Sequence, residues 1–120
     1  MKEIEYNLHD SIIAKASYKE NGRLELDVQL YEIFYPGSPM VKVIISGIFN
    51  KEKIESFFEE LTNDAEENDW IGYRIDSFKY DEKKQSTGAN VYLFLAVDHL
   101  DSIKIHCKKL KISVVCPEWH

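Results

Sequence analysis

Residues 50–70, NKEKIESFFEELTNDAEENDW, are the only part of the chain with the pattern of a long helix. Its apolar residues recur at the three- and four-residue spacing that places side chains on one stripe of an α-helix. These residues are Ile54, Phe57, Phe58, Leu61 and Ala65. Asn50 occupies the position of an N-cap, and Glu52 lies in the first turn, where negative charge is favourable. We therefore expect an amphipathic helix that buries one face on a sheet.

The other face of this helix is almost wholly acidic. Its carboxylates are Glu55, Glu59, Glu60, Asp64, Glu66, Glu67 and Asp69. Residues 50–70 carry eight acids and two bases, a net charge of −6 that equals the charge of the whole chain. Such a face suits a basic protein partner, through electrostatic steering and contacts at the rim of an interface. The alternative is a solvated helix face that only keeps the protein soluble.

The segments around the helix have the alternating pattern of strands. Three such segments precede it and three follow it, with short connections and no linker, in a chain of 120 residues. Consecutive strands with hairpin-length connections favour antiparallel pairing. We predict a single domain over residues 1–120 of the α+β class. It has a strongly bent, mainly antiparallel sheet of about six strands, in the order βββ-α-βββ, with the helix on one face.

The first strand should begin within residues 8–13, and residues 20–22, Glu-Asn-Gly, should turn the chain into the second. A three-residue loop with Gly22 in the left-handed conformation pairs Tyr18 with Leu24, Ala16 with Leu26 and Ala14 with Val28. This register keeps the apolar residues of both strands on one face. It is therefore preferred over a two-residue loop.

Changes in the phase of the alternation predict irregularities in two later strands. One is a bulge near Asp76-Ser77, and the other is a bulge or bend at Lys108-Lys109. Residues 81–89 are polar and predict a loop, whereas residues 91–97 (VYLFLAV) predict a central strand. Residues 31–39 contain two prolines and a glycine and predict an irregular loop. Its Phe34 and Tyr35 either face a partner or pack on the rim of the core.

Motifs for catalysis, metal binding and phosphate binding are absent from the sequence. The neighbours His9-Asp10 and Asp98-His99 each supply two residues, too few for a metal or acid–base site, so we interpret them as turn residues. His106 and Cys107 point to opposite faces of one strand, so they cannot act as a nucleophile and its base, and Cys107 is expected in the core. We expect no enzyme activity, no cofactor and no bound metal.

The lysines near the C-terminal end form a modest basic strip: Lys104, Lys108, Lys109 and Lys111. Aromatic residues do not interleave with them in the sequence, and the chain is acidic overall, so we expect no nucleic acid as a partner. No apolar run approaches 18 residues, and acids stand where a signal peptide has its apolar core. Two cysteines in an unexported chain are expected as free thiols. The expected location is therefore the cytoplasm, as a monomer or weak homodimer without membrane contact.

Parts of the sequence resemble a group of small bacterial proteins that includes immunity proteins of polymorphic-toxin systems. The resemblance lies in residues 8–13 (LHDSII), which match an (L/F)-H-D-(S/A)-x-(I/V) opening strand. It continues in the strands at residues 24–28 and 41–48, and in a closing strand, residues 103–114, with a mid-strand cysteine. It covers about half of the chain, and the acidic helix departs from the pattern.

The resemblance implies a cytoplasmic antidote that binds and blocks a toxin domain, for which a nuclease with a basic cleft is a natural target. We expect a non-enzymatic binding protein whose partner is a basic protein. The expected contact residues are Glu55, Glu59, Glu60, Asp64, Glu66, Glu67, Asp69, Phe34 and Tyr35. The alternative is a small-molecule or regulatory binding domain with its ligand between the sheet and the helix.

Overall fold

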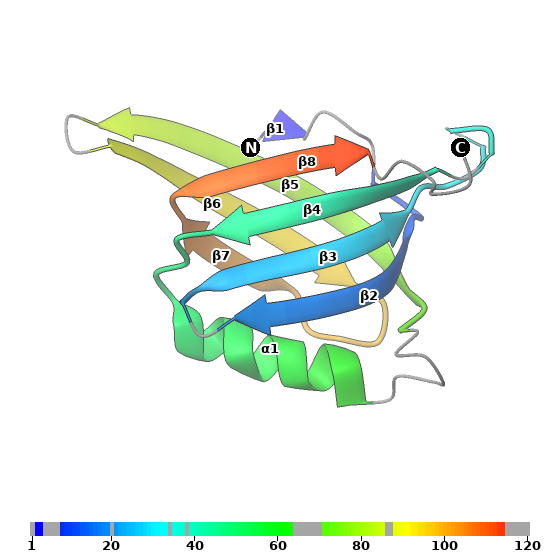
Figure 1. The fold of residues 1–120 in the computed structure, drawn as a ribbon, viewed down its shortest axis with the longest axis horizontal. Coiled ribbons are helices and arrows are strands. Elements are labelled where there is room, and N and C mark those ends of the chain that lie inside the picture. The colour runs from blue at the N-terminus through cyan, green and yellow to red at the C-terminus, as the bar shows by residue number, and fades with distance from the viewer. Residues whose placement is uncertain are drawn as a thin grey trace.

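A computed structural model describes residues 2–3, 8–19, 21–33, 35–37, 39–63, 71–85 and 88–114, with backbone alone at 2–3, 82–85 and 88–89. Within these residues the chain forms eight strands and one helix (Figure 1). The elements are β1 (Lys2–Glu3), β2 (Ile12–Lys19), β3 (Arg23–Gln29), β4 (Met40–Ser46), α1 (Lys51–Asn63), β5 (Tyr73–Gln85), β6 (Gly88–Val97), β7 (Ile103–Cys107) and β8 (Lys109–Val114).

All strand pairs are antiparallel, and seven strands follow one another in the order β7-β6-β5-β2-β3-β4-β8, with β1 added beside β5. The α+β class and the antiparallel sheet are therefore confirmed. The predicted count of about six strands is nearly right. The difference comes from the short β1 and from the last predicted strand, which divides at Lys108 into β7 and β8. These two strands lie at opposite ends of the strand order, although one residue separates them in the chain.

The bent sheet encloses one hydrophobic core. Buried and outward residues alternate strictly along β3, β4 and β7, as the period of two along a strand requires. Leu26, Val43, Leu93 and Ile105 are among the core residues with almost no exposed surface. β6 also alternates from Val91 to Val97, which confirms that this apolar stretch is an interior strand.

The β2–β3 hairpin has the predicted three-residue loop. Gly22 has a φ of 85°, and its N–H donates to the carbonyl of Lys19 at 2.9 Å. Tyr18 pairs with Leu24 and Ala16 pairs with Leu26, as predicted. The predicted pairing of Ala14 with Val28 is wrong, because a bulge between Ile13 and Lys15 makes Ile13 the partner of Val28. The extra residue lets both Ile13 and Ala14 be buried.

Two other boundaries differ from the sequence prediction. The segment Leu8–Ser11 is a turn rather than the start of a strand, since Asp10 has a φ of 64° and the N–H of Ser11 donates to the carbonyl of Leu8. β5 continues to Gln85, which pairs with Gly88, through most of the segment predicted as a loop. Backbone pairing between neighbouring antiparallel strands does not need apolar side chains. The predicted bulge at Asp76 is confirmed by the register shift between Ile75 and Ser77.

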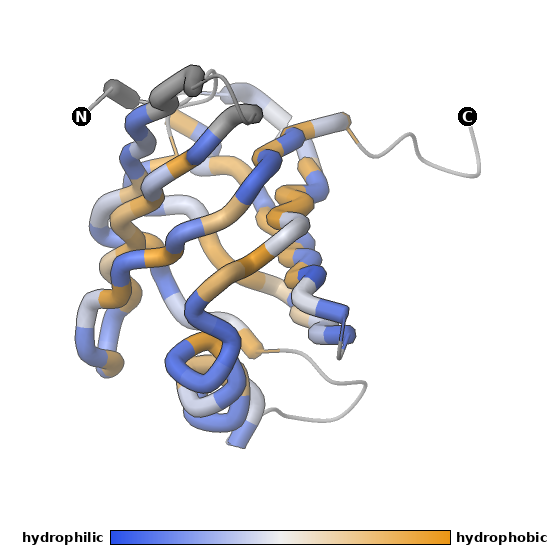
Figure 2. Tube along the Cα trace, turned by 90° about the vertical axis from the view of Figure 1, so that its left-hand side faces the viewer, coloured by the Kyte–Doolittle hydropathy of each residue, from blue (hydrophilic) through white to orange (hydrophobic). Residues whose placement is uncertain are grey.

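Helix α1 lies along β2 (Figure 1). It covers the part of β2 that extends beyond its short pairing with β5. Ile54, Phe57 and Leu61 are buried in the core, as predicted, whereas Phe58 is only half-buried and contacts Tyr18. In Figure 2 the apolar part of the helix faces the strands and the hydrophilic part faces away. Ala65 and the rest of the predicted helix segment, residues 64–70, lie outside the described part of the chain.

The connection between β4 and α1 lies along the free edge of β7. The N–H of Phe49 donates to the carbonyl of His106 at 2.8 Å. The side-chain amide of Asn50 accepts from the N–H of His106 at 3.0 Å and donates to the carbonyl of Lys104 at 2.8 Å. Asn50 does occupy the predicted N-cap position, directly before the first helical residue, but the hydrogen bonds of its side-chain amide within the described residues are made with β7. Its amide substitutes for a peptide group of a neighbouring strand.

Candidate partner-binding surface

The exposed face of α1 carries glutamates without ion-pair partners. Glu52, Glu55, Glu59 and Glu60 are all exposed, and none forms a salt bridge with another described residue. The last turn of α1 contains no basic residue. The sheet behaves differently, because Glu25 pairs with Arg23 and Asp27 pairs with Lys42, each at 3.5 Å. The helix therefore concentrates uncompensated negative charge.

These glutamates do not form a single row. Glu55 lies on the β2 side of the helix, close enough to Tyr18 for its charge to act on the phenol. Burial, followed by the negative charge of Glu55, raises the pKa of Tyr18. Glu60 lies on the other side, beside a depression that α1 forms with the start of β7. Successive residues of a helix turn by about 100°, so Glu59 falls on the Glu55 side.

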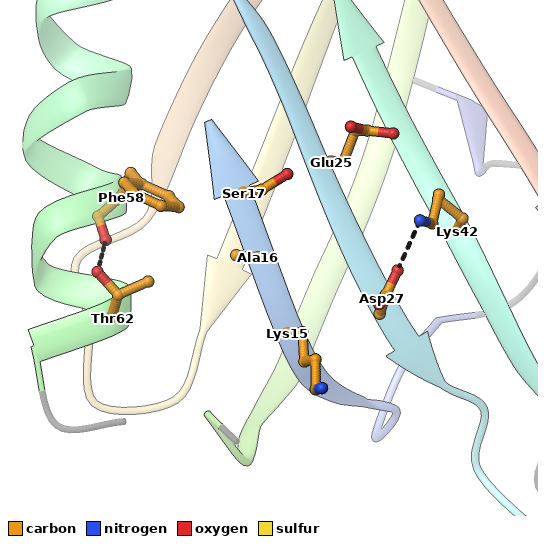
Figure 3. Close-up of a pocket in the computed structure, with 8 residues that line it drawn as sticks. All are labelled: Lys15, Ala16, Ser17, Glu25, Asp27, Lys42, Phe58 and Thr62. Atoms are coloured by element: carbon orange, nitrogen blue, oxygen red, sulfur yellow. Dashed lines mark hydrogen bonds and ion pairs between the residues drawn. The ribbon is translucent and has the colours of Figure 1, made fainter. Parts of the chain in front are cut away.

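A hollow of about 400 Å³ lies between α1 and the outer face of β2 and β3 (Figure 3). Its lining is Lys15, Ala16, Ser17, Glu25, Asp27, Lys42, Phe58 and Thr62. Phe58 forms its apolar wall on the helix side, and the hydroxyl of Thr62 donates to the carbonyl of Phe58 at 2.8 Å. Close by, the buried hydroxyl of Tyr18 has no hydrogen-bond partner among the described residues. The hollow thus has one apolar wall, formed by Phe58, and is otherwise lined mainly by charged and polar side chains, among them the Asp27–Lys42 ion pair.

Of the remaining predicted contact residues, only Tyr35 belongs to the described part of the chain. Asp64, Glu66, Glu67, Asp69 and Phe34 lie outside the described residues. Tyr35 is half-buried against the core, and its N–H donates to the carbonyl of Tyr31. In the same loop, Ile33 is 74% exposed, a residue that the sequence analysis did not select. Tyr35 therefore belongs to the rim of the core.

The two His/Asp neighbours come together at one depression of about 640 Å³, although the sequence gives no sign of their proximity. Asp10 contacts His9 at 3.1 Å and the guanidinium of Arg74 at 3.6 Å, while His99 contacts Asp98 at 3.4 Å. Asp10 and His99 both have positive φ, a backbone conformation that short polar residues tolerate in turns. Among the described side chains, no group of three or more could hold a metal ion.

Cys107 and His106 point to opposite sides of β7, as predicted. Cys107 is fully buried, and burial raises the pKa of its thiol to about 11. A thiol with this pKa is not a nucleophile at neutral pH. His106 lies on the outer face, where its ring stacks on Tyr92 with 4.5 Å between centroids. The sequence did not reveal this contact, because the two residues belong to different strands.

Comparisons with known proteins give no match. No protein-family profile, curated protein or solved structure is similar to the chain. Over the described residues, no helix has both the length and the apolar character needed to cross a membrane.

Proposed function

We propose that this chain is a non-enzymatic binding protein whose contact surface is the β2 side of α1. The observation that carries the proposal is that Glu55 and Glu59 are exposed and form no ion pair with another described residue, on the helix that supplies Phe58 as the apolar wall of the hollow. A hollow with a charged border suits a protein partner that inserts a side chain and places basic groups around it. Glu60 and the acids of residues 64–69 would extend the negative field that guides association.

The class of partner comes from the resemblance to immunity proteins. By this resemblance, the partner would be a bacterial toxin domain, and this chain would block the toxin by covering its active site. A nuclease with a basic cleft fits the acidic face, since carboxylates imitate the charge of phosphates. The assembly would form in the cytoplasm, with the chain as a monomer or weak homodimer and without a cofactor.

The test is stopped-flow association with the cognate toxin domain, identified from the neighbouring gene. The double variant Glu55→Lys/Glu59→Lys should slow association several-fold at low salt, and the difference should fade as salt rises. The reason is that exposed charges are screened beyond roughly 8–10 Å near physiological ionic strength. Glu32→Lys/Asp76→Lys is the charge-matched control, because it makes the same change of charge at exposed positions outside α1; it also removes the contact of Asp76 with Arg74 at 3.7 Å, so the fold of this variant is verified by circular dichroism. Equal rates for both double variants at low salt would place the interface elsewhere.

The hollow itself is tested by Ser17→Tyr. Ser17 is an exposed residue of β2 that lines the hollow, so a tyrosine there should fill the space without entering the core. Dissociation of the toxin domain should accelerate while the association rate changes little, because short-range fit mainly sets the dissociation rate. An unchanged dissociation rate would remove the hollow from the interface.

A small-molecule site is the second candidate, since the volume of about 400 Å³ lies within the usual range for ligand pockets. The same variants separate the two functions. A small ligand would lose its stabilising effect on Ser17→Tyr and keep it on Glu55→Lys/Glu59→Lys. A toxin domain would respond to both changes.

A further inference from the structure

The outer face of β6 and β7 collects aromatic and basic side chains that are far apart in the sequence. Core residues Val91, Leu93 and Ile105 point inward, so the residues between them must point outward. We call this surface the aromatic–lysine face. It consists of Phe49, Tyr92, Phe94, Lys104, His106 and Lys108. Phe49 belongs to the connection that lies along the edge of β7, so three separate segments build the face.

Three rings of this face, those of Tyr92, His106 and Phe49, form a continuous ladder. His106 stacks nearly parallel to Tyr92, at an interplanar angle of 11°, and the ring of Phe49 lies 4.4 Å from His106 on a tilt of 39°. A hydrogen bond of 3.0 Å joins His106 Nε2 to the side chain of Asn90 and fixes the imidazole. Phe49 is 51% exposed, so the ladder ends in a ring that is open to solvent.

Positive charge accompanies the ladder. Lys104 and Lys108 of the face pair with no carboxylate in the part of the chain that the structure describes, whereas Lys109 and Lys111 lie on β8, beside β4. Lys108 Nζ lies 5.8 Å from the centroid of the Phe49 ring. Three acids stand at the border of the face, with Asp81 opposite Tyr92, and with Asp101 and Glu60 at the depression that Phe94 and Lys104 also line. The positive charge available to a ligand is therefore that of Lys104 and Lys108, which these acids leave without an ion pair among the described residues.

We propose that the aromatic–lysine face binds single-stranded nucleic acid. Lysines would hold the phosphates, and the exposed ring of Phe49 would take the next place in the ladder for an unpaired base. An acidic peptide would satisfy the lysines but would have no flat rings for the ladder. A duplex would hide its base faces. This surface is separate from the one proposed for the toxin, so either proposal can fail alone. No aromatic residue lies between the lysines in the sequence, whereas the fold brings aromatic rings beside them from β6 and from Phe49.

The test measures fluorescence anisotropy of a labelled oligothymidylate of about 12 nucleotides, a length within the usual range of site sizes. The face has two lysines, so we expect weak binding, with a Kd of about 10⁻⁴ M that weakens further as salt rises. An oligonucleotide of the same length with abasic sites has the same charge and no bases, and it should bind about 10-fold more weakly. A duplex should also bind more weakly. Equal affinity for the abasic strand would mean an acidic partner and would overturn the proposal, as would the absence of binding at low salt.

Protein variants locate the site. Phe49→Ala should weaken binding about 10-fold, since loss of one stacking ring has effects of this size, and Phe49→Trp should keep it. Ile33→Ala is the matched control, because it truncates an exposed apolar residue in a distant loop. Lys104→Ala should weaken binding and reduce the slope of log K against log salt concentration by about 0.7. The exposed Lys15→Ala should change neither the affinity nor this slope. Circular dichroism verifies the fold of each variant. An affinity that is insensitive to Phe49→Ala or Lys104→Ala would refute the site.

Discussion

Replacement of Asn50 by alanine tests whether its amide completes the edge of β7. The amide makes two hydrogen bonds with backbone groups of β7, from the N–H of His106 and to the carbonyl of Lys104. The same residue stands immediately before α1, where its sequence position suggests a helix cap. The two roles predict different consequences for substitutions at this one position.

The size of the effect follows from the two hydrogen bonds. Each contributes about 0.5–1.5 kcal/mol, so their loss should destabilise the protein by about 1–3 kcal/mol. The N–H of His106 is partly buried, which favours the upper part of this range, because an unpaired buried donor adds a desolvation cost. A domain of this size typically has a stability of about 5–15 kcal/mol, so Asn50→Ala should remain folded at 25 °C.

Urea denaturation measures the total loss, and amide hydrogen exchange of His106 localises it. Exchange at this amide should accelerate about 5–30-fold for a loss of 1–2 kcal/mol, and about 150-fold for a loss of 3 kcal/mol. Asn50→Ser is the matched variant, because serine caps a helix as well as asparagine does but is too short to bridge to both β7 groups. Serine should therefore leave the exchange of the His106 amide accelerated. Wild-type stability of Asn50→Ser, together with wild-type protection of this amide, would show that Asn50 acts as a cap.

Two further changes concern the core. Phe57→Ala should lower the free energy of unfolding by about 3–5 kcal/mol, because its ring is buried at 5% exposure, and an unchanged melting temperature would contradict the position of α1. The pKa of the Cys107 thiol is about 11 in the folded chain against an ordinary 9.0, so the unfolded state loses this proton first as the pH rises. Stability should be unaffected by this group below pH 9.0 and fall between pH 9.0 and about 11, and urea titrations of Cys107→Val should show a smaller decline.

Local patterns in the sequence were sufficient for most elements of this fold. The helical spacing of Ile54, Phe57 and Leu61 identified α1 and its buried face. The turn at Gly22 predicted the register of β2 against β3 from Lys19 to Lys15, up to the bulge that shifts the pairing of Ile13. Each of these features depends on residues within a few positions of one another. The pairings of β2 with β5 and β4 with β8 join distant segments, and alternation within a strand does not say which neighbour it will have.

In the candidate sites too, features set by neighbouring residues could be predicted, and contacts between distant segments could not. Exposure of Glu55, Glu59 and Glu60 follows directly from the helical spacing. The stacking of Phe49, Tyr92 and His106 could not be predicted, because their contact exists only after three segments have assembled. Asn50 is an intermediate case: its position before the helix was predictable, but the partner of its amide depends on where β7 lies.

The division of the segment 103–114 at Lys108 has a consequence for how the protein folds during synthesis. Its first half, β7, pairs with β6, and its second half, β8, pairs with β4. Both partner strands leave the ribosome earlier. Until this segment emerges, β4 and β6 each present an unpaired edge with its backbone groups open to other chains. The pairing of β8 with β4 joins segments that are far apart in the chain, and such long-range pairing is slow to form, whereas β6 and β7 form a local hairpin. The nascent chain therefore passes through an interval in which protection by a chaperone would matter most.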